Sequence, residues 1–251
     1  MKIKTDTKLF FSISTFPSNR GSNLHNFLFT LFSMNSIYIP LSVKKLSSFL
    51  TFARDIGAAG FSVSMPYKKK IIKFLNKKSK EVILTNSCNT VLIKNSKLHG
   101  YNTDYLAIEK ILKNYKKFTN TGVQVLGYGA TSKTVLIVLK KLGFKKIFVY
   151  ARKKNKKIKG NISFIDWKKR NKNLSKILIN TTPIGMNLTK IDKPPISDDA
   201  IKSKKIIIDF PIAKKKYSSL QIKSKKCNVK YFSGNDIHFY QGINQAQIYL
   251  N

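Results

Sequence analysis

Between residues 123 and 150 the sequence changes from a strand pattern to a helix pattern and back to a strand pattern. The apolar segment Val123 to Leu126 runs directly into Gly127-Tyr128-Gly129-Ala130-Thr131, which is followed by apolar residues at helical spacing as far as Leu142. Gly143 then ends the helix and a second apolar segment begins. This order predicts a βαβ unit with glycines at its first crossover. Glycines there let the backbone approach a pyrophosphate at the positive N-terminus of the helix, so we expect a dinucleotide-binding unit.

The residues around this turn indicate which dinucleotide is bound. The third position of the usual glycine pattern is Ala130, so an ordinary strand-to-helix turn stays open as the alternative. About twenty residues beyond the turn, NAD-binding proteins place an acidic residue on the ribose. This chain instead has Ala151-Arg152-Lys153, and a guanidinium matches the 2′-phosphate of NADP. We expect NADP rather than NAD, although an Arg-Lys run also arises by chance in so basic a chain.

The first hundred residues also alternate between strand and helix patterns. Short apolar runs predict strands at 9–13, 37–40 and 61–64, and helical spacing predicts helices at 23–32, 44–55 and 67–75. Such alternation favours an α/β fold with a largely parallel sheet. A chain of 251 residues is long enough for two domains. We expect a mostly parallel α/β substrate domain at 1–103, a Rossmann-type domain at 104–235 with further strands at 177–180, 205–209 and 228–232, a cleft between the domains, and a C-terminal helix at 236–251 that packs back toward the first domain.

The formal charge of +37 comes from 48 Lys and Arg against 11 Asp and Glu. On its own that balance indicates a polyanionic partner. The lysines are spread along the whole chain, however, and accompany many Asn, Ile and Phe residues, whose codons are rich in A and T. We therefore favour a skewed base composition as the cause and expect no specific nucleic-acid partner.

Other compositional features bound the class of protein. The longest apolar runs fall far short of the ~20 residues that span a bilayer, and the N-terminus lacks the apolar run of a signal peptide. Two cysteines and three scattered histidines predict neither a disulfide framework nor a metal site. We expect a soluble, cytoplasmic protein with no membrane partner and no metal.

Three polar clusters precede the glycine turn. They read Ser64-Met65-Pro66-Tyr67-Lys68, Asn86-Ser87-Cys88-Asn89-Thr90 and Asn102-Thr103-Asp104. In this order, followed by the glycine turn, they resemble the shikimate dehydrogenase family, whose members carry Asn-Val-Thr-x-Pro-x-Lys, Val-Asn-Thr and Asn-Thr-Asp motifs. The resemblance continues through 180–186, Asp209, and Gly234 with Gln241, and covers nearly the whole chain.

The resemblance implies a reaction and a set of roles. The reaction is the reversible NADPH-linked reduction of 3-dehydroshikimate to shikimate, a step of the shikimate pathway toward chorismate and the aromatic amino acids. Lys68 and Asp104 would lie beside the hydroxyl that is oxidised, where an ammonium next to a carboxylate can hold the alcohol and relay its proton. Substrate hydroxyls would be bound by Ser64, Asn89 and Gln241, although each alone is more often a cap or turn residue. The expected cofactor-binding residues are Gly127, Tyr128, Gly129, Ala130, Thr131, Ala151, Arg152, Lys153 and Gly234.

One segment departs from the family pattern. Most members carry a His-Ser-x-Ser-Pro segment whose two serines hold the substrate carboxylate, and here those positions are Asn19 and Gly21. Asn19 can donate a hydrogen bond to a carboxylate, whereas Gly21 offers only its backbone amide. The altered segment is similar to the divergent shikimate-dehydrogenase-like branch. Still open are a dehydrogenase of quinate or an aminated shikimate, a folate-linked dehydrogenase, an inactive nucleic-acid-binding module, and a monomeric or homodimeric state.

Overall fold

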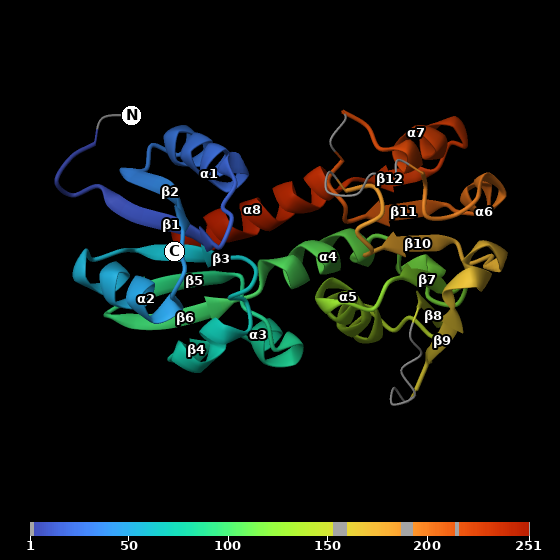
Figure 1. Ribbon diagram of the computed structural model, residues 1–251, viewed down its shortest axis with the longest axis horizontal. Coiled ribbons are helices and arrows are strands. Elements are labelled where there is room, and N and C mark those ends of the chain that lie inside the picture. The colour runs from blue at the N-terminus through green and yellow to red at the C-terminus, as the bar shows by residue number, and fades with distance from the viewer. Residues whose placement is uncertain (1–2, 153–159, 187–192, 214–215, 251) are drawn as a thin grey trace. The chain divides into compact units, whose positions relative to one another are not determined.

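The chain divides into two compact units in a computed structural model that describes residues 3–152, 160–186, 193–213 and 216–250 (Figure 1). The first unit comprises residues 1–106 and 239–251, and the second comprises residues 107–238. Each unit is built on a six-stranded sheet with helices, which confirms the predicted α/β class. Two helices, α4 (Thr103–Lys113) and α8 (Gly234–Leu250), contribute residues to both units.

The sheet of the first unit has the order β2-β1-β3-β5-β6-β4. Its strands are β1 (Lys8–Ser14), β2 (Ser36–Ser42), β3 (Gly60–Val63), β4 (Lys77–Lys78), β5 (Thr90–Lys94) and β6 (Lys97–Tyr101). The three strands expected from the sequence pair in parallel, with β1 between β2 and β3. In contrast, β5 is antiparallel to both of its neighbours. The β5–β6 hairpin was not expected, because its turn uses Asn95 and Ser96 at positive φ rather than the more recognisable Asn-Gly.

The helices of the first unit include the two expected at 23–32 and 44–55, whereas the helix at 80–85 was not expected. They are α1 (Asn19–Leu31), α2 (Leu46–Asp55), α3 (Lys80–Thr85) and the start of α4. The helix expected at 67–75 is wrong, since that segment forms a turn and the short 3-10 helix η1 (Lys70–Phe74). The carbonyl of Lys68 accepts a hydrogen bond from the Cys88 amide at 2.9 Å. A long-range bond therefore occupies an acceptor that an α-helix would use.

Alternating side chains of β1 divide the core of the first unit into two layers. Phe11 and Ile13 pack in a cluster that includes Phe49 of α2. Phe10, on the other face, packs with Phe29 of α1 and with Tyr249 near the end of α8. The sheet is therefore covered by α2 on one face and by α1 with the end of α8 on the other (Figure 1).

The outer edge of β2 is closed by a side chain. The Tyr38 amide donates to Asn26 Oδ1 at 2.8 Å, and Asn26 Nδ2 donates to the Tyr38 carbonyl at 3.0 Å. Two residues further along the strand, Pro40 has no N–H to offer. Since exposed edge strands are templates for pairing with other chains, Asn26 and Pro40 protect this edge.

The second unit has a fully parallel sheet of order β12-β11-β10-β7-β8-β9. Numbered along this unit, that is the 3-2-1-4-5-6 order of a Rossmann-type fold. Its strands are β7 (Val123–Leu126), β8 (Ile147–Ala151), β9 (Ile162–Asp166), β10 (Ile177–Asn180), β11 (Ile206–Asp209) and β12 (Lys230–Phe232), and its helices are α5 (Ala130–Lys141), α6 (Asp198–Lys202), α7 (Ser219–Lys226) and the 3-10 turns η2 (Lys116–Phe118) and η3 (Trp167–Lys172). The predicted strand-turn-helix-strand order is confirmed, whereas β9 was not expected.

Replacing Asn26 by Leu is predicted to destabilise the first unit. The substitution removes both bonds to the Tyr38 peptide groups, so we expect the free energy of unfolding to fall by about 1–3 kcal/mol. Asn23→Leu, in the preceding turn of the same helix and exposed, should change it by no more than about 0.5 kcal/mol. Urea unfolding of the three proteins checks this, and equal effects of the two substitutions would contradict the edge-closing role of Asn26.

Candidate active site

Lys68 and Asp104 form an ion pair in the first unit. The Lys68 Nζ to Asp104 Oδ2 distance is 2.6 Å, and about a quarter of each side chain is exposed, at 26% and 28%. Asp104 lies in the first turn of α4, where a carboxylate interacts favourably with the positive helix end. Asn102 holds that turn by accepting a hydrogen bond from the Tyr105 amide. The α4 turn thus fixes the position of Asp104, and both side chains of the pair remain partly exposed to solvent.

Asn89 is buried beside this turn, and its side-chain nitrogen has no hydrogen-bond partner among the described residues. Its Oδ1 accepts from the Thr103 amide at 2.8 Å and from the hydroxyls of Thr90 and Thr103 at 3.0 and 3.2 Å. Its Nδ2 is buried with no hydrogen-bond partner among the described residues. A buried polar group without a partner is costly, so an unpaired amide of this kind is typical of a ligand site.

The remaining expected substrate residues lie on three other segments of the first unit. Ser64 follows β3 and is exposed, and its amide donates to the Ile13 carbonyl at 2.9 Å. Asn19 and Gly21 lie in the first turn of α1, and Gln241 is half-buried on α8. The structure thus joins Lys68 to Asp104 and Asn89 to the residue before Asp104, whereas no hydrogen bond among the described residues links Ser64, Asn19, Gly21 or Gln241 to them. At Gly21 a Cβ would lie 3.6 Å from the Tyr38 ring, so a side chain is not excluded by packing.

Two residues of this region were missed by the sequence analysis. Gln245, on α8, donates to Thr90 Oγ1 at 2.9 Å and to the Asn89 carbonyl at 3.3 Å, and its Oε1 lies 3.1 Å from His25 Nε2. It lies one helical turn after Gln241, and this spacing was the only available signal. Ser14, at the end of β1, has a buried hydroxyl without a partner among the described residues.

In the second unit, the two glycines of the turn have different surroundings. Gly127 has a φ of +93°, and a Cβ there would lie 2.9 Å from Thr181 Oγ1. Thr181 Oγ1 in turn donates to the Leu126 carbonyl at 2.6 Å. Gly129 caps α5, and a Cβ there would meet nothing within 4 Å. The space in front of the α5 N-terminus is therefore open, as pyrophosphate binding requires.

The other expected cofactor residues surround this turn or lie at the next strand. Ala130 and Thr131 form the first turn of α5, and the Tyr128 ring packs edge-on against Phe164 with centroids 4.9 Å apart. The Gly127 amide donates to the Tyr150 carbonyl at 2.9 Å, which brings the glycine turn beside the end of β8. Ala151 ends β8 and is followed by the exposed Arg152. Lys153 lies outside the described residues.

Gly234, the first residue of α8, is enclosed by backbone. A Cβ at Gly234 would lie 2.6 Å from the Phe210 carbonyl oxygen and 2.7 Å from that of Pro211. These two residues directly follow β11. Only glycine therefore fits at this position, which gives Gly234 a structural requirement independent of any cofactor.

The buried carboxylate of Asp209 links the carboxyl ends of β10 and β11 through a hydrogen bond with Asn180. Asp209, 1% exposed, accepts hydrogen bonds from Asn180 Nδ2 at 2.7 Å and from the Tyr231 hydroxyl. Asn180 also accepts from the amide and hydroxyl of Thr182. Burial raises the pKa of Asp209 to about 6, and the two hydrogen bonds oppose this only in part. Asp209 thus fixes the segment that follows β10, next to the glycine turn.

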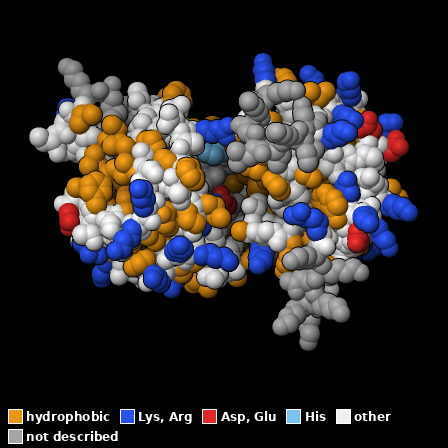
Figure 2. Space-filling view, in the orientation of Figure 1, with side chains coloured by type: hydrophobic (Ala, Val, Ile, Leu, Met, Phe, Trp, Pro, Cys, Tyr) orange, Lys and Arg blue, Asp and Glu red, His pale blue; other side chains and the backbone are white. Residues whose placement is uncertain are grey.

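The described ranges contain neither a metal-binding cluster nor a membrane-spanning helix. Within the described ranges, no three His, Cys, Asp or Glu side chains lie close enough together to hold a metal ion. No helix in those ranges has the length and apolarity needed to cross a membrane. On the face shown in Figure 2, Lys and Arg side chains are scattered over both units.

A Rossmann-type unit with an open helix N-terminus, next in the chain to an α/β unit with a Lys-Asp pair, places the protein among two-domain α/β oxidoreductases. Residues 19–91 match the model of the shikimate dehydrogenase substrate binding domain. The shikimate dehydrogenase-like protein of Haemophilus influenzae is 33% identical over 186 residues, which are 73% of this chain and 69% of that protein. The shikimate dehydrogenase (NADP(+)) of Clostridium beijerinckii is 31% identical over 236 residues, 90% of this chain and 85% of that protein.

A solved structure agrees with these sequence matches. The structure of a shikimate 5-dehydrogenase-like protein superposes with a TM-score of 0.88 at 28% identity and covers 99% of this chain and 93% of its own. The chain belongs to the shikimate dehydrogenase family. The resemblance drawn from the sequence motifs is thereby confirmed.

Replacing Asp209 by Asn is predicted to change how stability depends on pH. Because the folded pKa of about 6 lies above the ordinary value of 3.8, the folded chain holds this proton more tightly. The stabilisation is complete below about pH 4 and is lost as the pH rises through about 6. Relative to wild type, Asp209→Asn should therefore gain about 2.4 kcal/mol of unfolding free energy between pH 4 and pH 7.

Urea unfolding at four pH values between 4 and 7 measures this difference. Asp199→Asn is the control, since the Asp199 side chain is 94% exposed. Its difference from wild type should stay flat with pH. A flat difference for Asp209→Asn as well would contradict a carboxyl that titrates with a raised pKa.

Proposed function

We propose that this protein is an NADP-dependent shikimate dehydrogenase, which interconverts shikimate and 3-dehydroshikimate in the pathway to chorismate. The observation that carries the proposal is the 2.6 Å Lys68–Asp104 pair with the buried Asn89 amide fixed to the same turn. The name of the Clostridium beijerinckii relative supports both the substrate and the cofactor.

The pair supplies the proton chemistry of this reaction. The glycine turn and the N-terminus of α5 would hold NADP, which would supply the acceptor for the hydride of the carbinol carbon. Lys68, held by Asp104, hydrogen-bonds the hydroxyl oxygen as it changes from alcohol to carbonyl, and the hydroxyl proton passes to the pair. The reverse direction returns that proton to the new alcohol. Neither residue needs to move far, because their contact is already formed.

The surrounding polar groups would orient the substrate. In this proposal Asn89 Nδ2, Ser64 and Gln241 donate to the ring hydroxyls, while Asn19 and the Gly21 amide receive the carboxylate. Gln245 would position Asn89 rather than touch the substrate, because it binds the Asn89 carbonyl and Thr90.

A second candidate substrate is a related acid such as quinate or an aminated shikimate. The replacement of two serine positions by Asn19 and Gly21 favours it, since a glycine amide and a longer carboxamide place their donors differently from two hydroxyls. Assays with each acid separate the two.

Lys68→Ala and Asp104→Asn are each predicted to lower kcat for NADP reduction at least about 100-fold, because proton transfer in the transition state is lost. NADP affinity should be unchanged. Lys69→Ala, an adjacent exposed lysine with the same loss of charge, should keep wild-type activity. The rates are measured with shikimate and with quinate. If Lys68→Ala retained more than a tenth of the activity, the proposed role of the pair would be wrong.

Arg152→Ala is predicted to weaken NADP and leave NAD unaffected. A lost charge-assisted contact with the 2′-phosphate should raise the KM for NADP about 10- to 100-fold. Lys145→Ala, also exposed in the second unit, is the control for net charge. Equal losses for NADP and NAD would show that Arg152 does not read the 2′-phosphate.

A further inference from the structure

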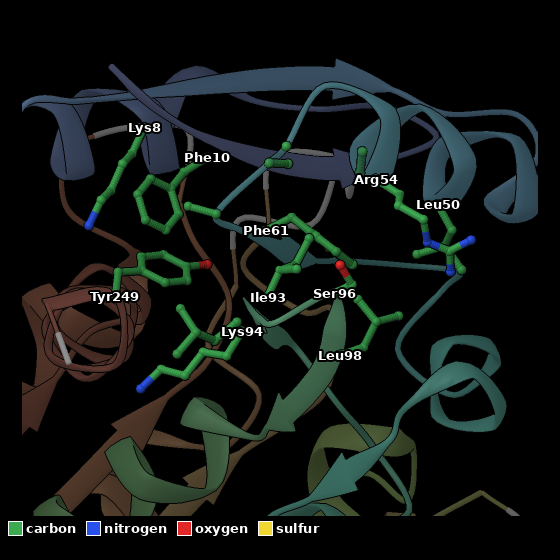
Figure 3. Close-up of a pocket in the computed structure, with 15 residues that line it drawn as sticks. Lys8, Phe10, Leu50, Arg54, Phe61, Ile93, Lys94, Ser96, Leu98 and Tyr249 are labelled. Atoms are coloured by element: carbon green, nitrogen blue, oxygen red, sulfur yellow. The ribbon is translucent and has the colours of Figure 1, made fainter. Parts of the chain in front are cut away.

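A cavity lies in the first unit, apart from the Lys68–Asp104 pair (Figure 3). It has a volume of about 440 Å³, which is within the usual range for small-molecule sites. Residues from β1, α2, the β5–β6 hairpin and the end of α8 line it. Among the lining residues are Lys8, Leu50, Arg54, Ile93 and Lys94.

The cavity and the candidate active site lie at opposite ends of the same strands. β1 begins with Lys8 at the cavity and ends with Ser14 in the region of the candidate active site. At ~3.3 Å per residue, these two ends are about 20 Å apart. β5 runs the other way, from Thr90 beside Asn89 to Lys94 at the cavity. A molecule bound in the cavity would therefore not occupy the substrate site.

The cavity combines an apolar centre with cationic ends. Leu50 and Ile93, which are partly buried, form part of the apolar surface, whereas the Phe10 and Tyr249 rings are 1% and 5% exposed and offer a ligand little area. Figure 3 shows Arg54 on one side of this surface and Lys8 with Lys94 on the other. Among the described residues, no acidic side chain lines the cavity. This charge pattern favours an anion with an apolar body.

Arg54 is the residue best placed to select a carboxylate. It is exposed on the last turn of α2 and makes no ion pair with any residue in the described part of the chain. A neighbouring cavity of about 320 Å³ shares Leu50, Arg54, Ser96 and Leu98 with this one, so Arg54 borders both. A planar guanidinium binds carboxylates through two parallel hydrogen bonds.

We propose that this cavity binds a small aromatic carboxylate. The carboxylate pairs with Arg54, the ring packs against Leu50 and Ile93, and the ammonium groups of Lys8 and Lys94 add a favourable field. An inorganic anion lacks the apolar contact, and a neutral ring lacks the contact with Arg54. Each therefore binds more weakly than the acid.

Calorimetric titration of the full chain with 3-phenylpropionate at 0.15 M salt tests the proposal, since this salt screens much of the net charge. Saturating shikimate is present to occupy any competing substrate site. We expect one site per chain. Affinity should fall at least tenfold for 3-phenylpropanamide, and acetate should give no measurable binding.

Matched variants separate the cavity from the general charge of the chain. Arg54→Gln should weaken 3-phenylpropionate at least tenfold, whereas Lys45→Gln, with the same charge loss just before α2, should leave affinity within twofold. Ala59→Leu fills the lining and should abolish binding without lowering the thermal midpoint by more than a few degrees. Absence of binding to wild type, or equal losses from Arg54→Gln and Lys45→Gln, would overturn the proposal. The readout is binding alone, so it does not depend on the proposed dehydrogenase activity.

Discussion

The hydrogen bonds around Cys88 and Asn89 are the constraint on which the candidate active site depends. The Cys88 amide donates to the Lys68 carbonyl, and Asn89 Oδ1 accepts from the Thr103 amide. These two bonds tie the segments that carry Lys68 and Asp104 to one strand start. The ion pair is then a consequence of backbone geometry rather than of two flexible side chains meeting, so it costs less conformational entropy than an exposed pair.

The scarcity of acidic residues makes the position of each one informative. With 11 carboxylates for 48 cations, most lysines in the chain can have no acidic partner. Even the buried Lys204 is held by the carbonyls of Asn173 and Ser175, and burial lowers its pKa to about 8. Asp104 and Asp209 are used otherwise, one in a half-open pair and one buried among neutral donors. Asp104 offsets the charge of Lys68, whereas the position of Asp209 is not explained by a need to offset a neighbouring cation.

Local pattern predicted the parts of the fold that are themselves local. Apolar periodicity and the glycine turn predicted the βαβ start of the second unit, and motif order indicated the family. Periodicity failed at 67–75, because the competing bond to Lys68 comes from residue 88 and leaves no mark on the local spacing. For the same reason Gln245 was missed, since its partners His25 and Thr90 are distant in sequence. The motifs indicated Asn89, but only the structure shows that its side-chain Oδ1 accepts three hydrogen bonds while its Nδ2 has no partner among the described residues.

The glycines of the cofactor unit show why a sequence pattern alone understates what such a site requires. Gly127 is needed because the chain itself, through Thr181, occupies the space a side chain would take, and Gly234 is needed because two carbonyls do so. At Gly129 the surrounding space is empty, so no packing requirement of the folded chain explains the residue. Under the proposed function, a pyrophosphate that approaches the backbone at this helix N-terminus would require a glycine. Of the three glycines, Gly129 is therefore the one that the proposed cofactor, rather than packing within the chain, would explain.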